Sequence, residues 1–81
     1  MQIRYSLTAT KALRRCDKRV LIREKIEQLS QDPSALSANV KKLSGREDYR
    51  LRVQNWRVLF RFGDGVLEID DVLPRGSAYE D

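Results

Sequence analysis

Arginine alternates with apolar residues in two short strings in the second half of the chain, and this pattern suits phosphate binding. The strings are YRLRV at 49–53 and WRVLFRF at 56–62. Side chains of a strand point alternately to opposite faces, so Arg50 and Arg52 share a face of the first strand, as Arg57 and Arg61 do on the second. A guanidinium group pairs two phosphate oxygens at once. Two such strands side by side would therefore form a platform for a polyanion.

A third string, PRGSAY at 74–79, adds an arginine and a tyrosine. Cleavage of RNA by its own 2′-hydroxyl needs a base, stabilisation of the charge that builds on the phosphate, and an acid for the leaving 5′-oxygen. The chain has no histidine, and arginine keeps its proton in proteins, so the arginines can only stabilise charge. Nearby positive charge favours the phenolate form of a tyrosine. Tyr79 or Tyr49 is therefore a candidate base, and Tyr79 could equally stack on a nucleobase.

Charge is unevenly distributed along the chain. The net charge is +4, but between positions 41 and 61 seven basic residues stand against two acidic ones. From position 62 onward the balance reverses, with six acidic residues and one basic residue. A basic cluster of this kind suggests a polyanion partner, first of all nucleic acid, although a solvated surface is the alternative from charge alone.

The sequence argues against disulfide, metal and membrane chemistry. One cysteine, Cys16, and no histidine exclude an intrachain disulfide and argue against a zinc site, so we expect no metal and no cofactor. The first residues lack the pattern of a signal peptide. No apolar run approaches the roughly 20 residues that span a bilayer. We therefore expect a soluble, cytoplasmic protein with no membrane partner.

Two helices are predicted to follow a short N-terminal strand. Residues 2–6 form a short alternating run, typical of a strand. Thr8 and Asp17 are the residue types that cap helix N-termini, so we expect a helix to begin after each of them. The second helix carries an apolar stripe spaced i, i+4, i+7, formed by Ile22, Ile26 and Leu29. The segment 32–34 is expected to end it.

A loop and three antiparallel strands are predicted to come next. Within the loop over 35–47, Val40 and Leu43 are expected to reach the core. The strands are predicted at 49–53, 56–62 and 66–73. Turn signals at 54–55 and 63–65 join them as hairpins.

The order of these elements predicts an α+β fold. An N-terminal strand, a two-helix hairpin and a three-stranded antiparallel meander are expected to form one layer of helices on one sheet face. The helices would be a structural layer, and the arginine face would stay open. No repeat or linker interrupts the sequence, so we expect one domain over residues 1–81.

In order and spacing, these strings resemble toxins of the RelE/ParE superfamily of bacterial type II toxin–antitoxin modules. The resemblance covers nearly the whole chain, from the helical hairpin through the strings at 39–45, 49–53, 56–60 and 74–79. It implies a small sheet with helices packed on one side. It also implies a cognate antitoxin protein as a partner that relieves toxicity.

The superfamily holds two activities. RelE-like members are ribosome-dependent endoribonucleases that cut mRNA in the ribosomal A site and so inhibit translation, whereas ParE-like members inhibit DNA gyrase and are not known as nucleases. RelE-like members carry an arginine and a tyrosine near the C-terminus that ParE-like members usually lack. Arg75 and Tyr79 match this pair. The resemblance therefore favours an mRNA endoribonuclease with the ribosome and mRNA as partners, and gyrase inhibition is the alternative.

The resemblance also implies roles for individual residues. Arg57 and Arg75 would clamp the scissile phosphate, and Tyr79 would act as the base or as a stacking platform. Five further basic side chains would hold the RNA: Arg50, Arg52, Arg61, Lys41 and Lys42.

Each of these roles has a structural alternative. The strand arginines could be surface residues or ion-pair partners of Glu68 and Asp70, and Arg57 could serve the fold alone. Tyr79 could pack the end of the chain onto the sheet. The acidic pair at 80–81, directly after it, disfavours the phenolate form and repels RNA, which argues either for slow cleavage or for another target.

Overall fold

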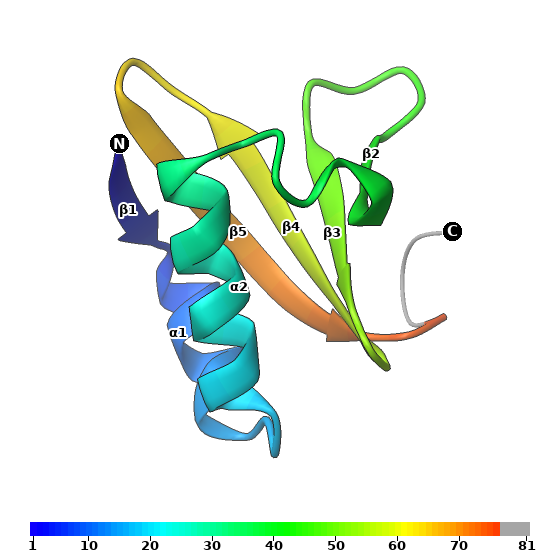
Figure 1. Cartoon of the computed structure of the whole chain (residues 1–81). Coiled ribbons are helices and arrows are strands. Elements are labelled where there is room, and N and C mark those ends of the chain that lie inside the picture. The colour runs from blue at the N-terminus through cyan, green and yellow to red at the C-terminus, as the bar shows by residue number, and fades with distance from the viewer. Residues whose placement is uncertain (77–81) are drawn as a thin grey trace.

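A strand, two helices and four further strands follow one another in the computed structural model of this chain, which describes residues 1–76 (Figure 1). The helices are α1 (Leu7–Arg14) and α2 (Arg19–Gln31), followed by a short 3₁₀ helix, η1 (Ser37–Asn39). The strands are β1 (Gln2–Tyr5), β2 (Val40–Lys42), β3 (Tyr49–Val53), β4 (Trp56–Phe62) and β5 (Val66–Pro74). The predicted order is confirmed, with one strand, β2, added before the meander.

Within the described residues, five strands form one sheet in the order β1-β5-β4-β3-β2. Strands β2 to β5 are antiparallel neighbours, whereas β1 lies parallel to β5, with Ile3 opposite Leu67. A parallel pair needs a crossover connection, and the two helices supply part of it. The α+β prediction is therefore confirmed, and the sheet as a whole is mixed, with the N-terminal strand at one edge.

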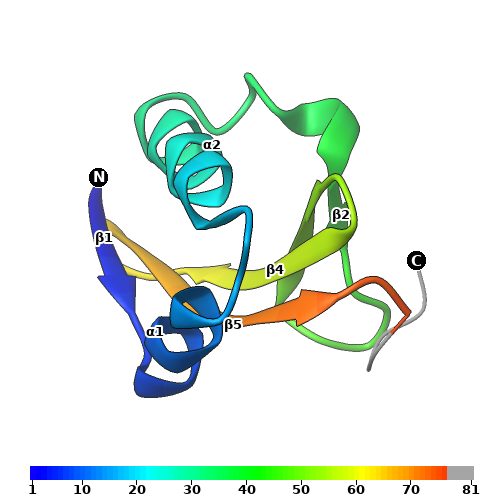
Figure 2. The ribbon, with the colours of Figure 1, turned by 90° about the horizontal axis from the view of Figure 1, so that it is seen from below.

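Both helices contribute to one hydrophobic core on one side of the sheet. In Figure 1 the chain runs down through α1 and back up through α2, which passes in front of β5, and Figure 2 gives the view from below. The buried core side chains come from the helices, the turn between them and the three central strands: Ala9, Leu13, Cys16, Ile22, Ile26, Leu29, Leu51, Val53, Val58, Phe60, Leu67, Ile69 and Val72. The predicted apolar stripe of the second helix is confirmed.

Helix α1 begins two residues earlier than the sequence suggested, because Ser6 caps it. The Oγ of Ser6 accepts a hydrogen bond from the backbone N–H of Ala9 at 2.9 Å and donates one to the carbonyl oxygen of Asp70 at 2.7 Å. The expected N-cap at Thr8 is wrong, since Thr8 lies inside the helix. One hydroxyl group thus caps the helix and fixes it to β5.

Helix α2 begins without a side-chain cap. Its N-cap is Lys18, which makes no capping hydrogen bond, so the expected cap at Asp17 is wrong. Asp17 lies one residue too early, in the tight turn between the helices. The helix ends at Gln31 before Asp32, as expected from the 32–34 segment. Within residues 1–76, neither helix combines the length and apolar character needed to cross a bilayer.

The predicted loop at 35–47 contains η1 and the edge strand β2. Three residues are too few to give a clear alternating pattern, so β2 forms because β3 offers it a pairing edge. Val40 lies opposite Leu51 and packs against the core, and Leu43 is buried. Both expected core anchors are confirmed.

Candidate nucleic-acid interface

Basic side chains gather on the sheet face opposite the helices. Arg52 lies directly opposite Arg57 in the β3–β4 register, and Arg50 lies opposite Lys41 of β2. The residue between the two arginines of β3, Leu51, points the other way and is buried in the core. Alternation on three neighbouring strands therefore brings four basic residues onto the open face.

Two other residues that the sequence singled out lie on the helix side of the sheet. Lys42 is opposite Tyr49 in the β2–β3 register. The ring of Tyr49 stacks on Phe60 with centroids 5.4 Å apart and meets Phe62 edge-on at 5.4 Å. The expectation that Tyr49 serves as a base among the arginines is wrong, because its ring packs against the core. Lys42 is exposed on that same side, away from the strand arginines.

Arg57 and Arg75, the pair expected to clamp a phosphate, both bind the turn between β3 and β4, Arg57 through its side chain and Arg75 through its backbone. The Nη1 atom of Arg57 donates hydrogen bonds to the carbonyl oxygens of Gln54 at 2.9 Å and Trp56 at 3.0 Å. The backbone N–H of Arg75 donates to the carbonyl oxygen of Asn55 at 2.8 Å. Arg57 is 6% exposed, whereas Arg75 is an exposed residue. One turn thus holds one fixed and one solvent-facing arginine.

This turn carries backbone strain at Gln54. Its φ is 54°, in the left-handed region, which is disfavoured for residues other than glycine. Two-residue hairpin turns that need a positive φ usually place glycine or asparagine there. The hydrogen bonds from Arg57 and Arg75 reach the carbonyls of this turn and help to hold it. The sequence predicted the turn at 54–55 but did not single out Gln54. The feature that could have identified it is a two-residue turn that contains no glycine.

The remaining basic residues of this end of the face differ in exposure. Arg50 is 7% exposed, whereas Arg52 and Lys41 are exposed. Among residues 1–76, no ion pair involves the side chains of Lys41, Arg52 or Arg75. We call Lys41, Arg50, Arg52, Arg57 and Arg75 the basic end of the open face. Lys41, Arg52 and Arg75 can therefore bind a phosphate without first breaking an ion pair to a described carboxylate.

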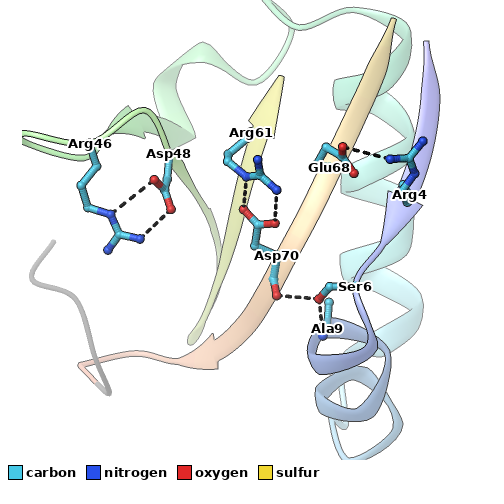
Figure 3. A network of polar contacts seen from close by, with 8 residues as sticks. All are labelled: Arg4, Ser6, Ala9, Arg46, Asp48, Arg61, Glu68 and Asp70. Atoms are coloured by element: carbon cyan, nitrogen blue, oxygen red, sulfur yellow. Dashed lines mark hydrogen bonds and ion pairs between the residues drawn. The ribbon is translucent and has the colours of Figure 1, made fainter. Parts of the chain in front are cut away.

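The other end of the open face is neutralised by ion pairs (Figure 3). Arg61 forms two hydrogen bonds with the carboxylate of Asp70, at 2.7 and 3.0 Å. Arg4 of β1 donates to Glu68 at 3.2 Å. The hydrogen bond and the charge of Asp70 raise the pKa of Arg61, so this guanidinium remains charged and bound. The alternative in which Arg61 pairs with Asp70 is confirmed. We call these four residues the paired end.

The two tyrosines whose rings the structure describes in contact with neighbours, Tyr5 and Tyr49, lie on the helix side of the sheet. Tyr79, the candidate base, lies outside the described residues, so its role stays a prediction. Burial raises the pKa of Tyr5, which lies on the helix side under the guanidinium of Arg23 at 4.8 Å from the ring centroid. Within residues 1–76, no three metal-ligating side chains cluster.

Solved structures with this fold are toxins of toxin–antitoxin modules. The RelE–RelB complex from the archaeon Pyrococcus horikoshii has a chain with 27% identity and a TM-score of 0.76, over 95% of this chain and 97% of the other. A chain of the E. coli RelBE complex has 19% identity and a TM-score of 0.75, over 94% of this chain and 98% of the other. YafQ from E. coli has 16% identity and a TM-score of 0.77, over 98% of both chains. The sequence itself matches no protein-family model and no curated relative.

These matches cover nearly the whole of each chain. They extend over at least 94% of this chain and 97% of each of the three matched chains. Their low sequence identities mean that the likeness rests on the backbone. In its fold, the chain is similar to the RelE toxins of these complexes.

Proposed function

We propose that this protein is the toxin of a toxin–antitoxin module and that it cleaves mRNA on the ribosome. The observation that carries the proposal is that the Arg57 side chain and the Arg75 backbone both bind the β3–β4 turn, next to Arg52, which lies opposite Arg57 on the open face. The likeness to the RelE, YoeB and YafQ toxins supports a toxin role. The basic end supports RNA as the target, because clustered arginine and lysine bind the phosphate backbone.

The basic end suits a reaction in which charge builds on a phosphate. The bond between the 2′-oxygen and phosphorus forms as the bond to the 5′-oxygen breaks, leaving a 2′,3′-cyclic phosphate and a 5′-hydroxyl. Prepositioned guanidinium groups stabilise the added charge, and they need no reorganisation as the reaction proceeds. The proton of the 2′-hydroxyl passes to a base, and the 5′-oxygen takes up a proton. Tyr79 is our candidate for the base.

Dependence on the ribosome follows from the lack of a strong acid–base pair. The chain has no histidine, and arginine does not release its proton. Alignment of the 2′-oxygen, phosphorus and 5′-oxygen by an external scaffold can lower the barrier instead. We therefore expect free RNA to be cut poorly and translated mRNA to be cut well.

A cleavage map tests this function directly. The chain is expressed in cells under a tight promoter, and primer extension on translated and untranslated copies of one mRNA locates the 5′ ends. We expect cuts at codon boundaries in the translated copy alone. Arg57→Ala and Arg75→Ala should weaken the cuts and relieve toxicity.

Two results would overturn the proposal. One is growth arrest with intact mRNA, above all if the purified protein then blocks DNA supercoiling by gyrase, which would make it an inhibitor of that enzyme. The other is equal cutting of translated and untranslated mRNA, which would remove the ribosome from the mechanism.

The proposed partner is a cognate antitoxin with an acidic or amphipathic segment that covers the basic end. Neutralising Arg50, Arg52 and Arg57 is the simplest means of inhibition. Solved complexes of RelE-like chains with RelB support such a partner. Co-purification of the chain with the product of the adjacent gene tests the proposal, and failure of that product to relieve toxicity would contradict it.

A further inference from the structure

The backbone of the β3–β4 turn holds the guanidinium group of Arg57. The Nη1 atom donates to the carbonyl oxygen of Gln54 at 2.9 Å and to that of Trp56 at 3.0 Å. Both acceptors are main-chain atoms, which cannot swing away as a side-chain acceptor can. Because the guanidinium group is planar, two bonds to fixed acceptors restrict the direction of the whole group. The conformation of the turn therefore bears on where Arg57 points.

The turn has the backbone signature of one particular hairpin type. Val53 pairs with Trp56, so the turn contains two residues, Gln54 and Asn55. Among residues 1–76, Gln54 is the only residue other than glycine with a positive φ, at 54°. A positive φ at the first turn residue alone is typical of type II′, whereas type I′ needs it at both. The two types differ by a flip of the peptide between these residues, and this flip reverses the direction of the Gln54 carbonyl.

The type II′ conformation is an unfavourable one for glutamine. Glycine is the usual residue at the first position of such a turn, because a side chain meets steric resistance at this φ. Strain of this kind persists only where the surroundings hold the backbone in place. Here the side chain of Arg57 binds the carbonyl of Gln54, and the backbone N–H of Arg75 binds that of Asn55. The turn and the orientation of Arg57 are therefore coupled.

We propose that Gln54 is a positioning residue, whose carbonyl in the type II′ turn sets the direction of the Arg57 guanidinium group on the open face. The inference rests on the proposed RNA cleavage, in which Arg57 stabilises charge on the phosphate, and it adds a main-chain group that acts through Arg57. In the alternative, Arg57 serves only to hold the hairpin together. Turn type and cleavage would then be independent as long as the hairpin stays stable.

Two turn variants with the same two residue types in opposite order separate these roles. Gln54→Gly gives the order Gly-Asn, which suits type II′ and keeps the carbonyl direction. Gln54→Asn combined with Asn55→Gly gives the order Asn-Gly, which strongly favours type I′ and turns the carbonyl away from Arg57. Both orders relieve the strain at position 54, so both melting temperatures should equal or exceed that of the unchanged chain.

The first measurement follows the order of the Arg57 side chain without any RNA. The Nε–H signal is recorded in ¹⁵N relaxation spectra of the full chain and assigned by its absence in Arg57→Ala. In the unchanged chain and the Gly-Asn variant we expect an order parameter close to that of rigid backbone, about 0.85. In the Asn-Gly variant it should fall below about 0.6, because the guanidinium group has lost one of its two backbone acceptors at the turn.

The second measurement is the rate at which translated mRNA is cut. The Asn-Gly variant should lose about tenfold or more, since a catalytic group misplaced by about 1 Å can cost about 10²-fold. The Gly-Asn variant should stay within about twofold of the unchanged chain. Adding Arg57→Ala to the Asn-Gly variant should give no loss beyond that of Arg57→Ala alone, because the turn acts through this one side chain.

Three results would overturn the positioning role: an equally ordered Arg57 in both turn variants, equal cleavage by both, and additive losses when the turn change is combined with Arg57→Ala. The relaxation measurement involves no RNA, so its failure is distinct from failure of the proposed function. If the unchanged chain leaves mRNA intact while the order of Arg57 still follows the turn type, the nuclease is removed and the coupling of turn and arginine stands.

Discussion

The arginines at the two ends of the open sheet face differ in what their guanidinium groups contact. At the paired end, Arg61 grips the carboxylate of Asp70 through two hydrogen bonds. At the basic end, Arg57 donates to backbone carbonyls, and Arg52 forms no ion pair within residues 1–76. The same residue type is therefore held in an ion pair at Arg61 and, within residues 1–76, forms no ion pair at Arg52.

The difference arises from the sequence of β5. Its acidic residues Glu68 and Asp70 lie beside the part of β4 that carries Arg61. At the other end of the same pair of strands, Arg57 lies opposite the apolar Leu73. The carboxylates of Glu68 and Asp70 thus account for the ion pairs of the paired end.

A bulge in β5 positions the carboxylate of Asp70 to bind Arg61. The register shifts so that Leu59 lies opposite Asp71 and Phe60 opposite Ile69. Asp70 is the extra residue between these pairs, and a bulged residue is re-aimed relative to the regular strand. Its carboxylate meets Arg61, and its carbonyl oxygen accepts from Ser6 of the α1 cap. One inserted residue therefore joins the helix, β5 and β4.

The largest effect is expected from Arg57→Ala. Removing one donor that stabilises transition-state charge typically costs about 10²- to 10³-fold in rate, and cleavage of translated mRNA should fall by that factor. The variant should also lose about 1–3 kcal/mol of unfolding free energy, because two carbonyls of the strained turn lose their donor. Primer extension and thermal denaturation measure the two effects.

Arg57→Lys and Arg61→Ala are the controls for this variant. The lysine keeps the charge but not the planar fork, so we expect partial activity. Arg61→Ala should leave cleavage within about twofold, since its guanidinium is committed to Asp70 and an exposed ion pair contributes little. Equal loss of activity in Arg57→Ala and Arg61→Ala would break the distinction between the two ends.

Arg75→Ala should reduce cleavage by about tenfold or more without changing stability. The side chain is exposed, and the turn is held by its backbone N–H, which alanine retains. Removing a single charge-assisted hydrogen bond costs about 1.5–3 kcal/mol, or one to two powers of ten in rate. The measurement is the cleavage rate together with an unchanged melting temperature. A parallel fall in melting temperature would assign Arg75 to the fold.

Arg52→Ala and Arg61→Ala form a matched pair for RNA affinity. Removing one cation that binds a phosphate should lower the slope of log affinity against log salt by about one. We expect this change for Arg52→Ala and almost none for Arg61→Ala, measured with a 2′-O-methyl RNA that cannot be cleaved. The same slope change in both variants would show that the ion pair with Asp70 opens on binding.

The smallest effect is expected from Asp70→Asn, which frees the guanidinium of Arg61. The carbonyl oxygen that accepts from Ser6 is kept, so the α1 cap should persist. Non-specific RNA affinity at low salt should rise by a few-fold, because one more cation faces the polyanion. Filter binding at two salt concentrations measures it. An unchanged affinity would mean that RNA does not extend over the paired end.

Features with a local cause were predictable from the sequence. The two-residue period places Arg50 and Arg52 opposite Leu51 whatever the rest of the fold does. The stripe of Ile22 and Ile26 identifies a helix face in the same way. Both are confirmed, because they depend only on the geometry of one element.

Features that need a neighbour were missed or misplaced. Ser6 rather than Thr8 caps α1, because its hydroxyl also reaches β5. Strand β2 exists because β3 offers it an edge. Tyr49 packs with Phe60 away from the arginines, since its position in the alternation assigns it to the core side.

The sequence by itself determined the order of the elements, the two strands with alternating arginines and the turn at 54–55 that joins them. Only the tertiary structure decided that Asp70 neutralises Arg61, and that the backbone of Arg75 binds the turn that the side chain of Arg57 also binds. The physical reason is the distance along the chain over which each feature acts, because strand alternation and turn signals depend only on residues close together in the sequence. An ion pair or a shared turn depends on which strand ends the fold brings within hydrogen-bond distance.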